Sequence, residues 1–220
     1  MTKRGIIEAV RLARDEGRRP LVLVRHGRTA ANAARVLVGR GDPPLDAEGW
    51  SQAAAVRPEL AALGPALFLT SPLLRARQTL GDLAPTAVVE ALVEVDHGTL
   101  EGLPGERLTR DHAGFLSRWE ADPDTTRLPG GESLGEAVAR ALPALQVQLD
   151  AHPAPALLVV CSHQLVIAAL CCALLAEPLR TWRAYANRNT GLTLLSEGMG
   201  GWRVDLRDDL SHLAQGVPQR

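Results

Sequence analysis

The stretch Pro20-Leu-Val-Leu-Val-Arg-His-Gly27 decides the fold class of this chain. Its first five residues are apolar and rich in branched side chains, which is typical of a strand buried on both faces of a parallel sheet. The apolar run ends abruptly at Arg25, and His26 follows. The sequence therefore predicts a buried strand with a histidine directly after its carboxyl end.

A second apolar run, residues 156–161, also ends just before a histidine, His163. Apolar periodicity and turn residues predict further elements. The predicted strands are 66–70, 87–90, 192–195 and 202–206, and the predicted helices are a short one before Gly17 and residues 49–63, 72–80, 108–119, 132–149 and 164–175. This alternation indicates an α/β fold with three α/β/α layers around a mainly parallel central sheet. Ligands bind at the carboxyl ends of parallel strands, so His26 and His163 are candidate site residues.

The chain is predicted to form one domain, residues 1–220, with three peripheral segments. Residues 1–19 are expected to form an N-terminal helical extension, and residues 207–220 a polar tail. Residues from about 94 to 132 are irregular and rich in Gly and Pro. A long excursion of this kind in a compact domain is usually functional, so it is predicted to be a small lid of helix and loop.

Composition and charge exclude several kinds of partner. The net charge of -1 gives no basic field for nucleic acid or an anionic membrane, and aromatic residues at 3% argue against stacking on single-stranded bases. No apolar run reaches the ~18 residues of a membrane-spanning helix. The three cysteines, Cys161, Cys171 and Cys172, lack metal-ligand or disulfide spacing. We expect buried thiols, a cytoplasmic location and a small-molecule partner, and a homodimer stays open.

The residues around His26 indicate anion chemistry. Arg25 and Arg28 flank the histidine, and Thr29 and Asn32 follow closely. Arginine forks match phosphate and carboxylate groups, and the asparagine amide adds neutral donors. Neighbouring cations should lower the pKa of His26 below its ordinary ~6.5 and leave a neutral nucleophile. The same cations disfavour a metal ion, so no metal or other cofactor is predicted.

The segment LVLVRHGRTAAN, residues 21–32, resembles the opening motif of the histidine phosphatase superfamily, which includes cofactor-dependent phosphoglycerate mutases. Further segments resemble this family in the same order along the chain. They are GRGDPPLDAEGWSQA (39–53), TSPLLRARQT (70–79), EVDHGTLEG (94–102), LPGGES (128–133), VVCSHQ (159–164) and NTGLTLL (189–195). Arg-His-Gly alone is a weak indication, whereas the ordered set is specific. The resemblance implies a phosphoglycerate mutase-like fold.

The resemblance also implies roles for the matching residues. His26 would attack phosphorus and hold the phosphoryl group, and Glu94 would act as general acid and then as general base. The phosphoryl oxygens would be bound by Arg25, Asn32, Arg75 and the second catalytic histidine, His163. Each preorganised donor can stabilise such a transition state by on the order of 3–4 kcal/mol.

Four further residues are candidates for the pocket: Arg28, Thr29, His97 and Gln164. The family usually has Glu at the position of Arg28 and Gly at that of Gln164. Arg28 either contacts the substrate or faces solvent, and Gln164 either narrows the pocket or packs on its helix. His97 either lines the pocket or lies on the surface.

Most remaining histidine and tryptophan residues are expected to be structural. His112, His152 and His212 lie among polar residues and are expected to be exposed. Trp50, Trp182 and Trp202 are expected in the core or an interface, and Trp119 either touches the substrate or packs the lid against the body. Glu101 is expected to support the acid-bearing loop, residues 94–102.

The favoured function is hydrolysis of phosphate monoesters through a phosphohistidine on His26. The alternative is a phosphoglycerate mutase, which must exclude water and bind a second anionic group. Such mutases usually have a longer, basic lid, whereas residues 94–132 are compact and balanced in charge. The acid-bearing loop resembles that of the phosphatase branch, including α-ribazole phosphatases. A non-catalytic phospho-ligand-binding domain is disfavoured because every catalytic residue of the family is present. No motif identifies the ester.

Overall fold

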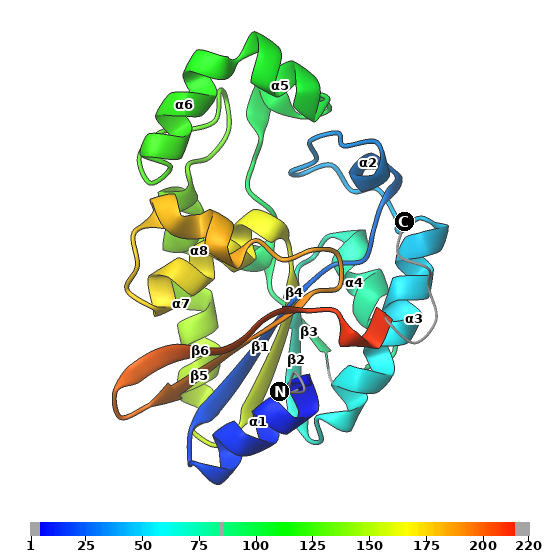
Figure 1. Cartoon of the computed structure of the whole chain (residues 1–220), viewed down its shortest axis with the longest axis vertical. Helices are drawn as coiled ribbons and strands as arrows, with labels where there is room; N and C mark the ends of the chain where they lie inside the picture. The colour runs from blue at the N-terminus through cyan, green and yellow to red at the C-terminus, as the bar shows by residue number, and fades with distance from the viewer. Residues whose placement is uncertain (1–4, 84–85, 214–220) are drawn as a thin grey trace.

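A six-stranded sheet forms the centre of the structure, a computed structural model that describes residues 5–83 and 86–213 (Figure 1). The strands are β1 (Arg19–Arg25), β2 (Ala66–Thr70), β3 (Thr86–Val88), β4 (Leu157–Ser162), β5 (Leu192–Gly198) and β6 (Gly201–Asp209). They lie in the order β3-β2-β4-β1-β5-β6. The first four pair in parallel, and β5 is antiparallel to both β1 and β6. The predicted mainly parallel sheet is confirmed, with one strand reversed.

Helices cover both faces of this sheet (Figure 1). The α-helices are α1 (Ile6–Asp15), α2 (Ala30–Ala33), α3 (Ala47–Ala62), α4 (Leu74–Leu80), α5 (Gly105–Asp111), α6 (Ala113–Ala121), α7 (Leu134–Ala151) and α8 (Gln164–Leu174). The short 3-10 segments are η1 (Glu90–Leu92), η2 (Gly98–Leu100), η3 (Leu179–Tyr185) and η4 (Ser211–Leu213). One core lies between the sheet and α1, α3 and α4, and the other between the sheet and α7 and α8. The predicted three-layer α/β/α architecture is confirmed.

Alternation along β1 explains why two cores form. Leu21 and Leu23 belong to the core under α7 and α8, while Val22 and Val24 belong to the core under α1, α3 and α4. All four side chains are fully buried. Because both faces of β1 are covered, its sequence is continuously apolar instead of alternating.

The lid contains two short helices, so the single helix predicted over residues 108–119 was wrong. The backbone of His112 leaves the helical region (φ -125°, ψ 22°), which separates α5 from α6. The apolar residues that suggested one helix, Leu108, Phe115 and Leu116, all line one cavity, although Leu108 lies on α5 and the other two on α6. In Figure 1, α5 and α6 lie beyond the carboxyl ends of the parallel strands.

The two ends of the described chain pack on the body. The predicted N-terminal helix is confirmed as α1, and Gly17 follows it with the left-handed φ of 69° that ends many helices. The predicted polar tail begins too early, because residues 207–209 belong to β6, an edge strand where polar residues can face solvent. Residues 1–4 and 214–220 of the two predicted terminal segments lie outside the described residues.

The prediction that His212 is exposed is wrong. His212 is only 7% exposed, because η4 folds back onto α3 and its Nε2 lies 3.1 Å from Oγ1 of Thr190. His112 and His152, also predicted to be exposed, are half-buried. Trp50 is 44% exposed on α3 and therefore lies outside the core of this chain, and the Arg57 guanidinium lies 5.8 Å from its ring centroid. The three cysteine thiols are buried as predicted.

Within the described ranges, no single helix is long and apolar enough to cross a membrane. The elements α8 and η3 reach the required length and hydropathy only as a pair bent by 116°.

Candidate active site

The carboxyl ends of β1 and β4 bring His26 and His163 together. Arg25 and Ser162 are partners in these neighbouring strands, so the histidines that follow them lie side by side, with ring centroids 5.2 Å apart. The backbone N–H of His26 donates to the Ser162 carbonyl at 3.0 Å, which continues the ladder past Arg25. Both histidines are buried. The structure thus joins the two histidines that the strand pattern placed at one edge.

His26 is a neutral ring whose free lone pair faces Arg75. Its Nδ1 lies 2.7 Å from the Gly27 carbonyl, which only accepts, so Nδ1 carries the proton. Nε2 therefore keeps its lone pair and accepts from Nε of Arg75 at 3.2 Å. Burial, then the charges of Arg25 and Arg75, lower the pKa of His26 well below its ordinary 6.5. The predicted direction of this pKa shift is confirmed.

His163 is held from two sides. Its Nε2 lies 2.7 Å from Oγ of Ser71, and its Nδ1 accepts from Nε of Arg75 at 3.2 Å. Burial, followed by the charge of Arg75, lowers the pKa of His163 well below 6.5. One guanidinium N–H is therefore shared between two neutral histidine rings.

Arg75 lies on α4 at the centre of the site and is 2% exposed. Its Nη1 donates to the Gly41 carbonyl at 2.7 Å and its Nη2 to the Gly39 carbonyl at 3.0 Å. Burial lowers the pKa of Arg75 below its ordinary value. The 39–41 loop can reach it only because residue 39 has no side chain: a Cβ there would lie 2.4 Å from the Val95 carbonyl oxygen.

Glu101 fixes this loop from the other side. Its Oε2 accepts from the backbone N–H of Gly39 at 2.8 Å, and its Oε1 accepts from that of Gly41 at 3.1 Å. The same two glycines give their carbonyls to Arg75. Glu101 therefore ties the acid-bearing loop to the loop that orients Arg75.

Arg25 and Asn32 present further donors. Nη1 of Arg25 donates to the Asn187 carbonyl at 2.9 Å. Burial, partly opposed by the charge of Glu94, lowers the pKa of Arg25 to about 10, so it stays protonated at neutral pH. Oδ1 of Asn32 accepts from the backbone N–H of Thr29 at 3.1 Å in the capping box of α2. This leaves the Nδ2 group of Asn32 as a donor for the cavity.

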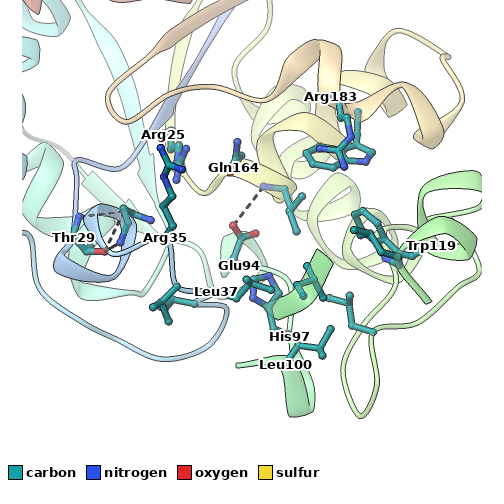
Figure 2. A pocket seen from close by; sticks show the side chains of 18 of the residues that line it. Arg25, Thr29, Arg35, Leu37, Glu94, His97, Leu100, Trp119, Gln164 and Arg183 are labelled. Atoms are coloured by element: carbon teal, nitrogen blue, oxygen red, sulfur yellow. Dashed lines mark hydrogen bonds between the residues drawn. The ribbon is translucent and has the colours of Figure 1, made fainter. Parts of the chain in front are cut away.

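Glu94 lies across the cavity from Arg25 (Figure 2). Its Oε1 accepts from the backbone N–H of Val95 at 2.9 Å, and its Oε2 from that of Leu165 at 3.4 Å. Leu165 is in the first turn of α8, whose N–H groups have no partner inside the helix. Because Glu94 raises the pKa of both Arg25 and Arg75, its carboxylate is close enough to complement the two cations.

These groups line one cavity of about 360 Å³ between the end of the sheet and the lid (Figure 2). The predicted site residues that line it are Arg25, His26, Thr29, Asn32, Arg75, Glu94, His97 and Gln164. His163 contacts the cavity through Arg75. Within the described ranges, the buried nitrogens without a hydrogen-bond partner include Nε of Arg25, Nδ1 of His97 and Nε1 of Trp119, all from lining residues. Such groups are rare in proteins, and these three are free to bond a ligand. Arg18, Arg19 and His212 contribute the other such nitrogens among the described residues, away from the cavity.

Arg28 is the predicted pocket residue that points elsewhere. Its Nε pairs with Oδ2 of Asp46 at 2.8 Å, and its Nη1 pairs with Glu48. These acids cap and begin α3, where they also complement the helix dipole. Arg28 therefore anchors α3 instead of lining the cavity. Arg77, two residues after Arg75 on α4, is exposed and does not line the cavity.

Sequence reasoning missed two polar residues that position the histidines. Ser71 bonds the ring of His163, and Nδ2 of Asn189 donates to the His26 carbonyl at 3.0 Å and to Oδ1 of Asn32 at 3.4 Å. Ser71 directly follows β2, and Asn189 lies shortly before β5, which runs antiparallel to β1. Both residues therefore lie at the edge of the sheet that holds His26 and His163, and this position could have identified them from the sequence.

The site combines a neutral imidazole, two guanidinium groups and a carboxylate, a set suited to displacement at an anionic centre. In the part of the chain that the structure describes, no three or more His, Cys, Asp or Glu side chains gather in a way that could hold a metal ion.

Comparison with known proteins gives one family. Residues 21–210 match the sequence profile of the histidine phosphatase superfamily, branch 1. A probable phosphoglycerate mutase of Cronobacter sakazakii is 31% identical over 201 residues, which cover 87% of this chain and 93% of that protein. A mycobacterial glucosyl-3-phosphoglycerate phosphatase is 33% identical with a TM-score of 0.77, covering 86% of this chain and 98% of that one. Bacillus stearothermophilus YhfR is 27% identical with a TM-score of 0.79, covering 88% and 98%.

Proposed function

Because this chain belongs to the histidine phosphatase superfamily, we propose that it hydrolyses phosphate monoesters through a covalent phosphohistidine on His26. One observation carries the proposal. Nε2 of His26 keeps a lone pair at the wall of the cavity, 3.2 Å from the guanidinium Nε of Arg75. A neutral nucleophile beside fixed positive charge suits attack on a phosphorus with negative oxygens.

In the first step, Nε2 of His26 attacks phosphorus in line with the ester oxygen. The N–P bond forms, the P–O bond breaks, and its electron pair leaves with the alcohol oxygen. Glu94, protonated for this step, gives its proton to that oxygen, so a neutral alcohol departs. The hydrogen bond from Nδ1 to the Gly27 carbonyl, 2.7 Å long, orients the ring and stabilises the charge of the phosphorylated imidazole.

In the second step, water takes the phosphoryl group. Glu94 removes a proton from the water as its oxygen attacks phosphorus, and the N–P electron pair returns to His26. Inorganic phosphate leaves, and both side chains recover their starting states. Proton transfer of this kind accelerates a reaction by roughly 10²–10⁴-fold.

The proposal assigns phosphoryl binding to Arg25, Arg75, Asn32 and His163. Buried charges interact strongly because water does not screen them, and donors fixed before the reaction need no reorganisation. The hydrogen bonds of Arg75 to two loop carbonyls supply this rigidity.

A phosphoglycerate mutase is the second candidate, because the Cronobacter sakazakii relative bears that name. A mutase returns the phosphoryl group to another hydroxyl and must hold the carboxylate of a small acid. Most of the cavity beyond the phosphate-binding end is apolar and offers little to hold such a carboxylate, which favours hydrolysis.

Phosphate release from 4-nitrophenyl phosphate tests the proposal. The wild type should release phosphate with and without EDTA, and His26→Ala should not. His152→Ala is a matched control, because His152 is half-buried at the end of α7 and bonds the Gln148 carbonyl away from the cavity. Quenched reactions with labelled substrate should yield an acid-labile, base-stable label. Equal rates for wild type and His26→Ala would refute the proposal, and isomerisation of 3-phosphoglycerate faster than its hydrolysis would select the mutase.

A further inference from the structure

We propose that the physiological substrate is the phosphate monoester of a bulky, mainly apolar and uncharged alcohol. The carbon skeleton of this alcohol would lie between the lid and the amino-terminal end of α8. This inference rests on the proposed hydrolysis at His26. The composition of the cavity wall supports it.

The cavity has two chemically different ends. One end holds the cations, His26 and Glu94 described above. The apolar wall, as we name the other lining, consists of Val36, Leu37, Val38, Leu100, Leu108, Phe115, Leu116, Trp119, Leu128, Leu165 and Trp182. Small-molecule sites usually join a large apolar lining to a few polar groups that fix orientation. A phosphate held at His26 would therefore extend its ester group along the apolar wall.

The lid side chains of this wall lack a core of their own. Leu108, Phe115 and Leu116 are only partly buried, and α5 has no fully buried residue. Trp119 is the buried residue of α6, and its ring meets Trp182 edge-on at 5.7 Å. The two tryptophans join the lid to the body, while Leu108, Phe115 and Leu116 pack at the edge of the core and also line the cavity. An apolar ligand would remove this surface from water, which stabilises the complex.

The far end of the cavity offers little for a second anion. Arg183 lines it, but its guanidinium pairs with Glu120 and stacks over the Trp182 ring, 4.5 Å from the centroid. The positive charge of Arg183 is thus already balanced. Arg35 is exposed at the rim of the cavity near α2. A carboxylate on the body of the substrate would face the apolar wall, so an uncharged body fits better.

A series of linear alkyl phosphates tests the inference, because ethyl, butyl, hexyl and octyl phosphate have similar leaving groups but different apolar lengths. Burial of each methylene can raise kcat/KM by up to about fourfold. We expect kcat/KM to rise at least tenfold from ethyl to hexyl phosphate. The kcat/KM for hexyl phosphate should also be higher than that for 3-phosphoglycerate or glucose 6-phosphate. A flat series, or a preference for the polar esters, would overturn the inference.

The 4-nitrophenyl phosphate assay separates this outcome from failure of the proposed function. If His26-dependent release persists while the alkyl series is flat, only the substrate inference fails. If the wild type releases no phosphate from any ester, the hydrolase itself is refuted.

Variants of the apolar wall locate the effect. Phe115→Ser and Leu116→Asn should each lower the hexyl-to-ethyl ratio of kcat/KM at least fivefold. Val147→Ser is the control, because Val147 is 63% exposed on α7 outside the cavity, and it should leave the ratio unchanged. An unchanged ratio in both lid variants, with melting temperatures like that of the wild type, would place the apolar recognition elsewhere and overturn the inference.

Discussion

Nε of Arg75 lies 3.2 Å from Nε2 of His26, the nitrogen that the proposed mechanism uses as nucleophile. The same N–H also reaches Nδ1 of His163 at 3.2 Å. Arg75 thus holds both rings as acceptors and keeps them unprotonated. In the proposed mechanism, a phosphoryl oxygen takes over the N–H of Arg75, and the lone pair of His26 is then free to attack phosphorus.

Replacing Arg75 with lysine should therefore be costly despite the retained charge. The planar guanidinium of Arg75 bonds the two loop carbonyls and the two histidines through three different nitrogens. The single nitrogen of lysine cannot reach all of these partners. We expect kcat/KM for 4-nitrophenyl phosphate to fall by about 10²–10³-fold, as when one preorganised donor is lost. Arg77→Lys, two residues along the same helix and exposed, should change it less than twofold. Similar losses in both variants would contradict the role of Arg75.

Replacing Glu94 with glutamine should affect esters according to their leaving groups. Glutamine keeps the shape but cannot donate a proton to the departing oxygen, so alkyl phosphates should lose roughly 10²–10⁴-fold in kcat/KM. The loss with 4-nitrophenyl phosphate should be much smaller, because nitrophenolate leaves without a proton. Glu90→Gln, at an exposed residue of η1, is the control. An equal loss for both ester types would argue against Glu94 as the general acid.

The strand-end histidines could be predicted because the evidence for them is local. Residues 20–24 and 156–161 are continuous apolar runs, and His26 and His163 follow them directly. Parallel neighbours end at the same edge, so two local patterns implied one site. Arg75 differs: only the family resemblance identified it, because its partners Gly39 and Gly41 are remote in sequence.

The remaining features depend on contacts that no local pattern records. Arg28 follows His26 closely in sequence, yet its side chain pairs with the acids at the start of α3 and points away from the cavity. The apolar wall gathers residues from α5, α6, η3 and the loop after α2. Its members resemble ordinary core residues until the fold joins them. The break at His112 likewise has no signal in the apolar spacing.

Acid should begin to destabilise the fold at a higher pH than protonation of its carboxylates alone would cause. Protonation of His26 and His163 is disfavoured in the folded state, since burial lowers both pKa values well below 6.5. The unfolded chain binds these protons near pH 6.5. The stability that depends on the two neutral histidines is therefore fully present above that pH and is lost as the pH falls below it. The free energy of unfolding should fall by up to about 1.4 kcal/mol per pH unit for each histidine.

Urea denaturation at pH 7.5, 6.5, 5.5 and 5.0 measures this slope. Carboxylates titrate near pH 4 in the unfolded chain and contribute below this window. His26→Gln should remove the contribution of one histidine to this slope, which is at most about 1.4 kcal/mol per pH unit. A constant free energy of unfolding from pH 7.5 to 5.0 would show that the buried histidines accept protons freely.

Removing the Glu101 carboxylate should impair catalysis without contact to substrate. Glu101 holds the amides of Gly39 and Gly41, and their carbonyls hold Arg75, so Glu101→Ala should loosen the guanidinium through the loop. We expect kcat/KM to fall about tenfold, the effect of roughly 1.4 kcal/mol in the barrier. Glu101→Gln should recover part of this loss, because its amide oxygen can still accept from one of the two glycines. Asp150→Ala, on the exposed surface of α7, is the control. If Glu101→Ala lowered only the melting temperature and left kcat/KM intact, the loop would stabilise the fold without positioning Arg75.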